Sequence, residues 1–476
     1  MPRRFIRTIA WALTVLVLAL ITIVATLRLG SLLAAAVRDP ARWYGGLGLA
    51  FIAAYIVGSA ALILAAWIVG SRSARGFWLQ PVLVVALAVG VRAALAIAFD
   101  APLAGENGVI HAQALGVLDD ASCCFSHRPM GYPLSLAGAY AMFGIGPGAI
   151  EALNIACATV TTWLVFDIGR VVWDRRVGLV AATMYAVVPS QVLLILPPLT
   201  EPLYITAITG MVRIALMRAP PLLLTAALIG LSIAAAQYVR ATATSLLAPV
   251  LLLPILLGEG IRRWTLRAGI TVTAFVVGMA PVIWFNLQTH GDLSVSTSAY
   301  AGWSVYVGAN TKAAGRFNSE DSEFFATLPG ESAWERSEIA GQLGIRRILD
   351  DPGGYLMMQP RKFAVLWGDE SYAGSYAFSP AGPATTSLTE IAWLLSQLFY
   401  VPILMLALLA LAIGRASLQP GVLLIGMIVS LVAATHVFLE VHSRYHAYLL
   451  PLLVLLAAGG TDAAARFWLH RRDSSA

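Results

Sequence analysis

The chain has 476 residues, of which 59% are hydrophobic and 12% charged, whereas soluble domains carry about 25% charged residues. This composition excludes an ordinary water-soluble fold. The formal net charge is +6. Because the arginines fall in the connections between apolar runs, this charge requires no nucleic-acid partner.

Apolar runs recur along the whole chain. A helix that crosses a bilayer needs about 20 mostly apolar residues, because lipid offers backbone N–H and C=O groups no partners. We therefore expect an all-α polytopic membrane protein embedded in the lipid bilayer. About twelve transmembrane helices are predicted, near residues 8–29, 47–70, 79–99, 149–169, 177–194, 200–217, 221–238, 243–258, 269–287, 391–413, 420–440 and 444–460.

Arginines alternate between the connections of these helices. Cytoplasmic loops carry an excess of Arg and Lys. If the amino terminus is cytoplasmic, alternate connections should be basic, and they hold Arg3, Arg4, Arg7, Arg72, Arg75, Arg170, Arg175, Arg176, Arg218, Arg262, Arg263, Arg267, Arg415, Arg466, Arg471 and Arg472. Both termini are then cytoplasmic. The preference for Arg over Lys and the abundance of alanine are typical of high-GC bacterial genes, which indicates a bacterial plasma membrane.

Two long connections divide the chain. We expect two N-terminal transmembrane helices in 1–78, a transmembrane core in 79–287 with its first outer loop at 100–148, an extracytoplasmic segment in 288–390, and C-terminal transmembrane helices with a cytoplasmic tail in 391–476. In the extracytoplasmic segment, residues 292–306 alternate as an extended stretch. Residues 332–349 carry apolar side chains at helical spacing, so this segment is predicted to be mixed α/β.

Ionisable side chains gather at the predicted outer ends of the helices rather than within them. Transporters place such groups near the bilayer midplane, often in two matching halves. The outer groups are Asp100, Glu106, His111, Asp119, Asp120, His127, Arg128, Glu201, Arg240, His290, Glu440, His442, Arg444 and His446. This distribution favours a site that handles a substrate at the membrane surface, with a lipid or polysaccharide transporter as an alternative.

Several short motifs follow one another in a set order. They are Glu106-Asn-Gly-Val-Ile-His111, His127-Arg128-Pro129-Met-Gly131-Tyr132-Pro133, Gly169-Arg170, Pro197-Pro-Leu-Thr200-Glu201, Gln237-Tyr238 before Arg240, Gly308-Ala-Asn310, and Arg444-Tyr445. In this order they resemble membrane glycosyltransferases of the GT-C superfamily. The most similar branch holds the protein O-mannosyltransferases and the lipid A aminoarabinose transferase, and the resemblance covers roughly residues 79–460.

The resemblance implies a GT-C-like fold and an inverting transfer of sugar from a polyprenyl-phosphate donor. The acceptor would be an extracytoplasmic cell-envelope glycan or glycolipid, or a protein. Such a reaction needs a carboxylate to take the acceptor proton and cations to stabilise the leaving phosphate. The catalytic Asp of the family's first loop corresponds to Glu106, although the family's Asp-Glu pair is Glu106-Asn107 here. The alternatives for the base are Asp100, Asp119, Asp120 and Glu201.

The resemblance also implies other site residues. The expected donor-phosphate ligands are Arg128, Arg240, Arg444 and Tyr445, and the expected sugar or acceptor pocket contains His111, His127, Tyr132, Glu201 and His442. A guanidinium suits phosphate because it offers a planar fork of donors. The alternative for the arginines is contact with lipid headgroups. For Glu201, the alternative is a first-turn acid in a helix that begins after Thr200.

No obligatory cofactor is expected, since the histidines show no recognisable metal-ligand spacing. A divalent metal stays open, with His127 as the best single ligand. A third hypothesis is a non-catalytic GT-C-like accessory protein, for which Asn107 gives mild support.

Overall fold

The computed structural model describes residues 2–70, 79–120, 128–217, 221–379, 387–413 and 418–474. Within these ranges every regular element is an α-helix or a 3-10 helix, and no β-strand is assigned. The prediction of an all-α protein is confirmed.

Within the described ranges, eight stretches are long and apolar enough to cross a membrane. They lie in α1 (Pro2–Arg38), α2 (Pro40–Gly70), α3 (Leu79–Ala98), α6 (Pro147–Val172), α10 (Leu222–Val239), α19 (Ser387–Ile413), α20 (Pro420–Phe438), and the 3-10 helix η2 (Ser443–Leu449) with α21 (Leu450–Ser474). Each coincides with a predicted apolar run, because apolar length alone decides whether a helix can span hydrocarbon. The chain is therefore a multi-pass membrane protein.

A bent pair of helices forms a ninth candidate span. α12 (Ile261–Gly278) and α13 (Ala280–His290) meet at an angle of 55°. Met279 separates them, and Pro281 lies in the first turn of α13. Because proline has no backbone N–H, it cannot donate the hydrogen bond that would continue α12.

The other three predicted spans are shorter helices, so the prediction of about twelve exceeds what helix length supports. The run 177–194 is divided between α7 (Arg175–Val187) and α8 (Pro189–Leu193), because Val188 before a proline adopts an extended conformation. The runs 200–217 and 243–258 form α9 (Glu201–Ala215) and the 3-10 helix η1 (Ala241–Leu246) with α11 (Leu247–Leu257). Length and composition support eight spans in the described chain, or nine with the bent pair.

Residues 288–390, predicted to be extracytoplasmic, are helical where the structure assigns regular elements. It contains α14 (Ala301–Gly308), α15 (Ser319–Thr327), α16 (Ala333–Asp350), α17 (Pro352–Trp367) and α18 (Tyr372–Phe378). The helix predicted at 332–349 is confirmed as α16, with the Ser332 hydroxyl accepting a hydrogen bond from the Glu335 N–H at 3.2 Å.

The extended stretch predicted at 292–306 is wrong for residues 301–306, which form part of α14. Tertiary packing outweighs the alternating pattern there. A Cβ on Gly302 would lie 1.8 Å from the Ser337 carbonyl oxygen, so α14 approaches α16 as closely as backbones allow. The mixed α/β prediction fails for the described part of this segment.

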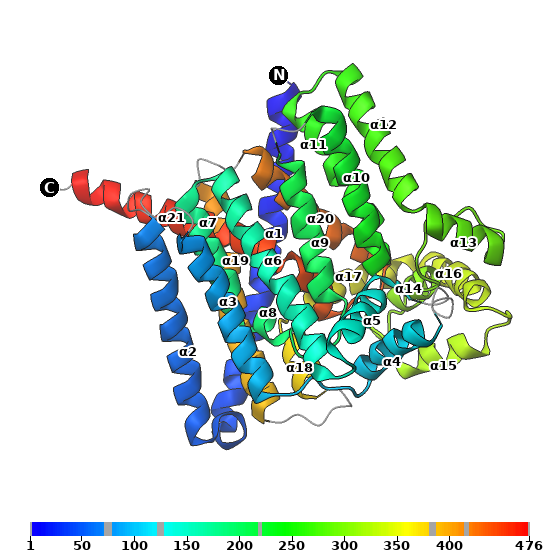
Figure 1. Cartoon of the computed structure of the whole chain (residues 1–476), viewed down its shortest axis with the longest axis horizontal. Helices are drawn as coiled ribbons and strands as arrows, with labels where there is room; N and C mark the ends of the chain where they lie inside the picture. The colour runs from blue at the N-terminus through cyan, green and yellow to red at the C-terminus, as the bar shows by residue number, and fades with distance from the viewer. Residues whose placement is uncertain are drawn as a thin grey trace.

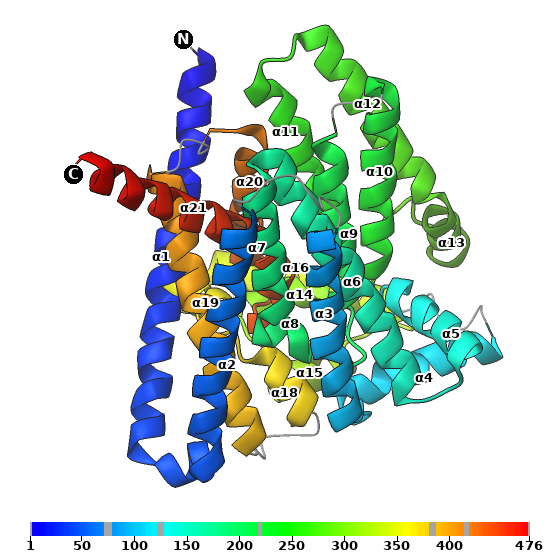
Figure 2. The same ribbon diagram turned by 60° about the vertical axis from the view of Figure 1, so that its left-hand side comes forward.

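Both chain ends lie at the upper end of the helix bundle in Figure 1 and Figure 2. The helices of the first long loop, α4 (Glu106–Asp119) and α5 (Gly131–Phe143), lie toward the lower end in both views, as does α18. This arrangement agrees with the prediction that the termini and the first long loop lie on opposite sides of the membrane. The assignment of the upper end to the cytoplasm stays a prediction.

A buried amide fixes the turn that leads into α9. Asn154 of α6 is fully buried and donates from Nδ2 to the carbonyl oxygens of Ile195 and Pro197, both at 3.1 Å. Its Oδ1 accepts a hydrogen bond from the Tyr132 hydroxyl at 2.9 Å. The amide thereby links α5, α6 and the residues just before Glu201.

Replacing Asn154 with alanine should destabilise the protein by about 2 kcal/mol, because buried carbonyls and a buried hydroxyl lose their partners. Thermal unfolding in detergent measures the change. Thr159→Ala is the matched control, because that hydroxyl lies one turn further along α6 and bonds only within its own helix, to the Ile155 carbonyl. Equal melting temperatures for the two variants would contradict this account of the turn.

Candidate active site

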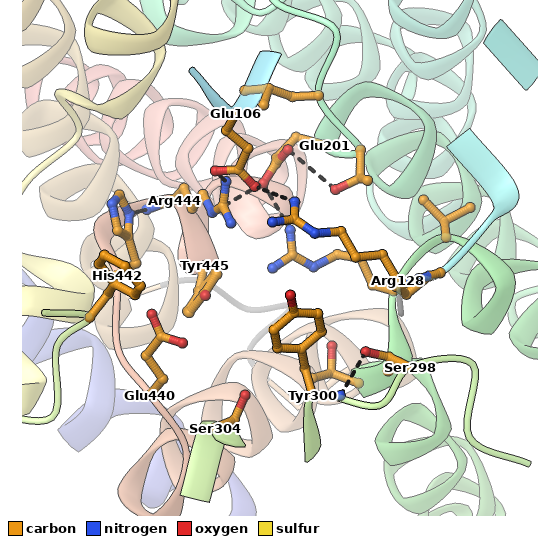
Figure 3. A pocket seen from close by; sticks show the side chains of 18 of the residues that line it. Glu106, Arg128, Glu201, Ser298, Tyr300, Ser304, Glu440, His442, Arg444 and Tyr445 are labelled. Carbon is orange, nitrogen blue, oxygen red and sulfur yellow. Dashed lines mark hydrogen bonds and ion pairs between the residues drawn. The ribbon is translucent and has the colours of Figure 1, made fainter. Parts of the chain in front are cut away.

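A cavity of about 720 Å³ lies where several helices begin or end (Figure 3). Side chains from α4, α9, α14, α18, η2 and the stretch 439–442 line it. Seven of the residues that the sequence predicted for the site are among them: Glu106, Arg128, Glu201, Arg240, His442, Arg444 and Tyr445.

Glu106 is the first residue of α4 and lies at the centre of the charged cluster. Gly105 before it has φ +58°, a left-handed conformation that glycine adopts without strain and that begins the helix abruptly. One carboxylate oxygen of Glu106 accepts from Arg128 Nη1 at 3.1 Å. The other accepts from Arg444 Nη1 at 2.8 Å and from the Tyr376 hydroxyl at 3.0 Å.

These contacts decide the ionisation of Glu106. Burial on its own raises the pKa of this carboxyl, but the Arg444 and Arg128 guanidiniums and the Tyr376 hydroxyl outweigh burial and lower the pKa to about 2. Glu106 is therefore a carboxylate at neutral pH, and it holds two guanidiniums beside the cavity.

A second ion pair lies deeper in the cavity wall. Arg240 follows the end of α10 and donates from Nη1 to Glu201 Oε1 at 2.8 Å. Glu201 is 1% exposed and begins α9, where an acid complements the helix dipole. The Arg240 guanidinium carbon lies 5.1 Å from the centre of the Tyr445 ring and 5.6 Å from that of Tyr448, which places it in an aromatic enclosure.

Arg444 joins the two pairs into one alternating cluster. Its Nη1 bonds Glu106, and its Nε lies 4.0 Å from Glu201 Oε1. The order in space is therefore Arg128, Glu106, Arg444, Glu201, Arg240, three guanidiniums with two carboxylates (Figure 3). The buried Nε–H of Arg444 has no hydrogen-bond partner among the described residues. The cluster thus keeps one excess positive charge and one unused donor.

The 3-10 helix η2 orients Arg444 toward the cavity. His442 precedes it and accepts the Arg444 N–H through Nδ1 at 3.2 Å. Burial lowers the pKa of His442 to about 3, helped by the Arg444 charge, so the imidazole is neutral and able to accept. On the opposite side, His446 is fully buried and bonds the Glu370 carboxylate and the Leu366 carbonyl. His442 and His446, four positions apart, therefore have different partners: His442 binds the Arg444 N–H beside the cavity, and His446 binds buried groups.

Two residues predicted for the sugar or acceptor pocket do not line this cavity. Tyr132 is fully buried, and its hydroxyl donates a hydrogen bond to Asn154 Oδ1. His111 lies on α4 beyond Glu106 and pairs with the Tyr140 hydroxyl at 2.7 Å. Both side chains pack α4 and α5 in place, so their position is structural. The third, His127, lies outside the described residues.

Tyr376 and Glu440 are among the cavity residues to which sequence reasoning gave no role in the site. Tyr376 lies on the short helix α18 and bonds both Glu106 and Arg444. Glu440 lies in the connection between α20 and η2 and lines the cavity opposite the cluster. No local motif marks Tyr376. Glu440 belongs to the set of outer ionisable groups, but it is part of none of the motifs.

In the described part of the chain, no three His, Cys, Asp or Glu side chains gather closely enough to hold a metal ion. The expectation of no obligatory metal, with a divalent metal still possible, stays a prediction, since His127 lies outside the described ranges.

Fold and site together define a multi-pass helical membrane protein with a cavity lined by arginine and glutamate. No family model and no curated protein matches the chain. Two solved structures of ArnT from Cupriavidus metallidurans are similar to it. The one bound to undecaprenyl phosphate has a TM-score of 0.41 and 13% identity over 82% of this chain and 79% of that one. The apo structure has a TM-score of 0.36 and 14% identity over 82% and 78%.

ArnT is the lipid A aminoarabinose transferase. Similarity at this level says nothing of what the chain binds or transfers.

Proposed function

We propose that the chain is an inverting glycosyltransferase that moves a sugar from a polyprenyl-phosphate carrier onto an acceptor at the extracytoplasmic surface of the plasma membrane. The observation that carries this proposal is the alternating cluster of three arginines and two glutamates beside the cavity. Its excess positive charge and the unused Nε–H of Arg444 suit a phosphate group.

The chemistry of lipid-linked sugars explains why arginines are needed. When the bond between the anomeric carbon and the phosphate oxygen breaks, the leaving phosphate gains negative charge. Fixed guanidiniums stabilise that charge most strongly when they are already oriented and shielded from water. In this proposal Arg128 and Arg444 bind the phosphate, and Arg240 supports them from the aromatic enclosure near Tyr445.

The place of the cluster suits a donor whose chain lies in lipid. Arg240 follows the last residue of α10, Glu201 begins α9, and Arg444 lies at the start of the last candidate span. All three are thus at ends of apolar helices. In this proposal the polyprenyl chain stays among the spans while its phosphate and sugar enter the cavity. The site is then extracytoplasmic in a bacterial plasma membrane, with both termini cytoplasmic.

Side chains of the predicted extracytoplasmic segment form part of the cavity wall, which supports a role for this segment in selecting the acceptor. Ser298, Tyr300, Trp303, Ser304 and Phe325 of this segment line the cavity. A mixture of hydroxyls and aromatic rings is suited to binding sugar rings. In this proposal the segment covers the donor and helps to choose the acceptor, which we take to be a cell-envelope glycan or glycolipid.

A transporter would place ionisable groups within its membrane spans, and Arg92 is a charged residue in such a span. Arg92 of α3 is fully buried, but its guanidinium donates to the carbonyls of Ala186 and Gln191 on either side of the break before α8. These bonds satisfy the backbone freed by the helix break. A structural function therefore accounts for Arg92, and this charge gives no support to a transport pathway.

A screen of radiolabelled polyprenyl-phosphate sugars against membranes containing the chain tests the proposal. We expect radiolabelled sugar from one donor class to be transferred to an envelope fraction. This transfer should occur only with membranes that contain the wild-type protein. The variant Arg128→Met/Arg444→Met serves as the negative control. If purified, folded wild-type protein transfers sugar from none of the donors to any envelope fraction, the glycosyltransferase proposal fails and the transporter or accessory hypothesis is favoured.

A further inference from the structure

Three glutamates line the cavity, and two of them, Glu106 and Glu201, already form ion pairs with arginines. The oxygens of Glu106 accept three hydrogen bonds, from Arg128, Arg444 and Tyr376. Glu201 accepts from Arg240 and is 1% exposed. A carboxylate that already neutralises guanidiniums is a poor proton acceptor, because protonation would break those ion pairs.

Glu440 differs from both. Its side chain lines the same cavity but forms no ion pair and no side-chain hydrogen bond with the described residues. In Figure 3 its carboxylate lies across the cavity from the Glu106–Arg444 pair, below Tyr445. It is thus a carboxylate that is free to receive a proton from a bound molecule.

The backbone that carries Glu440 is held firmly. The Glu440 N–H donates to the Ser304 carbonyl at 2.8 Å, and the Val441 N–H donates to the Gly315 carbonyl at 2.9 Å. A Cβ on Gly308 would lie 2.5 Å from the Phe438 carbonyl oxygen, so only glycine permits this close approach of α14. A fixed backbone positions the carboxylate without help from side-chain partners.

The surroundings of Glu440 suit proton exchange near neutral pH. Burial, joined by the negative charge of Glu106, raises the pKa of this carboxyl to about 7 against the opposing charges of Arg444, Arg240 and Lys362. Tyr445 also faces this group. A general base works best when its pKa lies near the working pH.

We infer that Glu440 accepts the proton of the acceptor hydroxyl during sugar transfer. This inference rests on the proposed function and revises the sequence-based assignment of that role to Glu106. The acceptor oxygen forms a bond to the anomeric carbon, and the bond from that carbon to the phosphate oxygen breaks. The bonding electrons leave with the polyprenyl phosphate, and the hydroxyl proton passes to the Glu440 carboxylate. Glu106 then acts as a positioning residue that holds the Arg128 and Arg444 guanidiniums.

The pH dependence of kcat in the wild-type protein gives the first test, and it needs no variant. With donor and acceptor saturating, kcat should be low at acid pH and rise through a midpoint near 7, because the base must be deprotonated. A Glu106 base with a pKa of about 2 would give no such rise above about pH 4. A flat profile between about pH 5 and pH 9 would overturn the inference.

The variant Glu440→Gln gives the second test. We expect kcat to fall by about 100-fold or more and the midpoint near 7 to disappear, while the donor KM changes by less than about threefold. The matched control is Glu338→Gln, an exposed acid on α16, which should behave as wild type. If Glu440→Gln does not fold, Glu440→Asp decides, since a displaced carboxylate should reduce kcat and keep a titration midpoint.

The outcomes separate this inference from the proposed function. Wild-type kcat and an unchanged pH midpoint in Glu440→Gln would remove Glu440 as the proton acceptor while leaving the glycosyltransferase intact. Absence of transfer by the wild-type protein would instead refute the proposed function itself.

Discussion

Replacing Arg444 with methionine should reduce kcat/KM for sugar transfer by about 1000-fold. Arg444 is the one arginine of the cluster that contacts Glu106 and also approaches Glu201, and its Nε–H is the donor left without a partner. Its removal takes away a fixed positive charge at the position where the leaving phosphate gains negative charge. Methionine keeps the length and the apolar packing of the side chain but provides no donor.

Initial rates with a labelled polyprenyl-phosphate sugar measure this effect. The matched control is Arg346→Met on α16, an exposed arginine that does not line this cavity. Folding is checked by thermal unfolding of both variants. An Arg444→Met protein that is folded and transfers sugar at more than about one tenth of the wild-type rate would exclude Arg444 as a phosphate ligand.

Replacing Glu106 with glutamine should lower kcat by about 100-fold and leave binding of polyprenyl phosphate as tight as in wild type, or tighter. Glu106 neutralises the Arg128 and Arg444 guanidiniums in the empty site. Without its charge both guanidiniums attract the product phosphate more strongly, while their alignment for the transition state is lost. The result differs from that of a missing base, because the rise of kcat near pH 7 should persist.

Equilibrium binding of polyprenyl phosphate and the pH profile of kcat are measured together for this variant. Asp119→Asn, at the exposed end of the same helix α4, should leave both quantities unchanged. A Glu106→Gln protein that binds polyprenyl phosphate much more weakly would show that Glu106 does not compete with phosphate. Loss of the pH-dependent rise would return the role of base to Glu106.

The membrane-spanning helices could be predicted from the sequence because apolar length is a local property. The chain shows this in α2 and α19, where the candidate spans Gly48–Gly70 and Ser387–Ile413 lie within a few residues of the predicted 47–70 and 391–413. The run 177–194 was misread because Pro189 divides it, although its apolar character is continuous. For α14, the alternating pattern was overridden by close packing of Gly302 against α16.

The site was harder to predict because its members are distant in the chain. Glu106 and Arg444 are 338 positions apart, and their places at predicted outer helix ends do not show that the two side chains contact each other. Tyr376 and Glu440 carry no motif, so their places in the cavity follow only from the packing of α18 and α14. Tyr132 belongs to a motif but packs in the core, because a motif records neighbours in sequence and not the direction of a side chain.

The most direct test of the account is an experimental structure of the purified chain with polyprenyl phosphate bound. We predict that the phosphate lies in the 720 Å³ cavity, within hydrogen-bond distance of the Arg128 and Arg444 guanidiniums. A phosphate held instead by Lys312, Arg316 and Arg361, which line a separate cavity, would contradict the account, and Glu106 would then have no part in binding the donor.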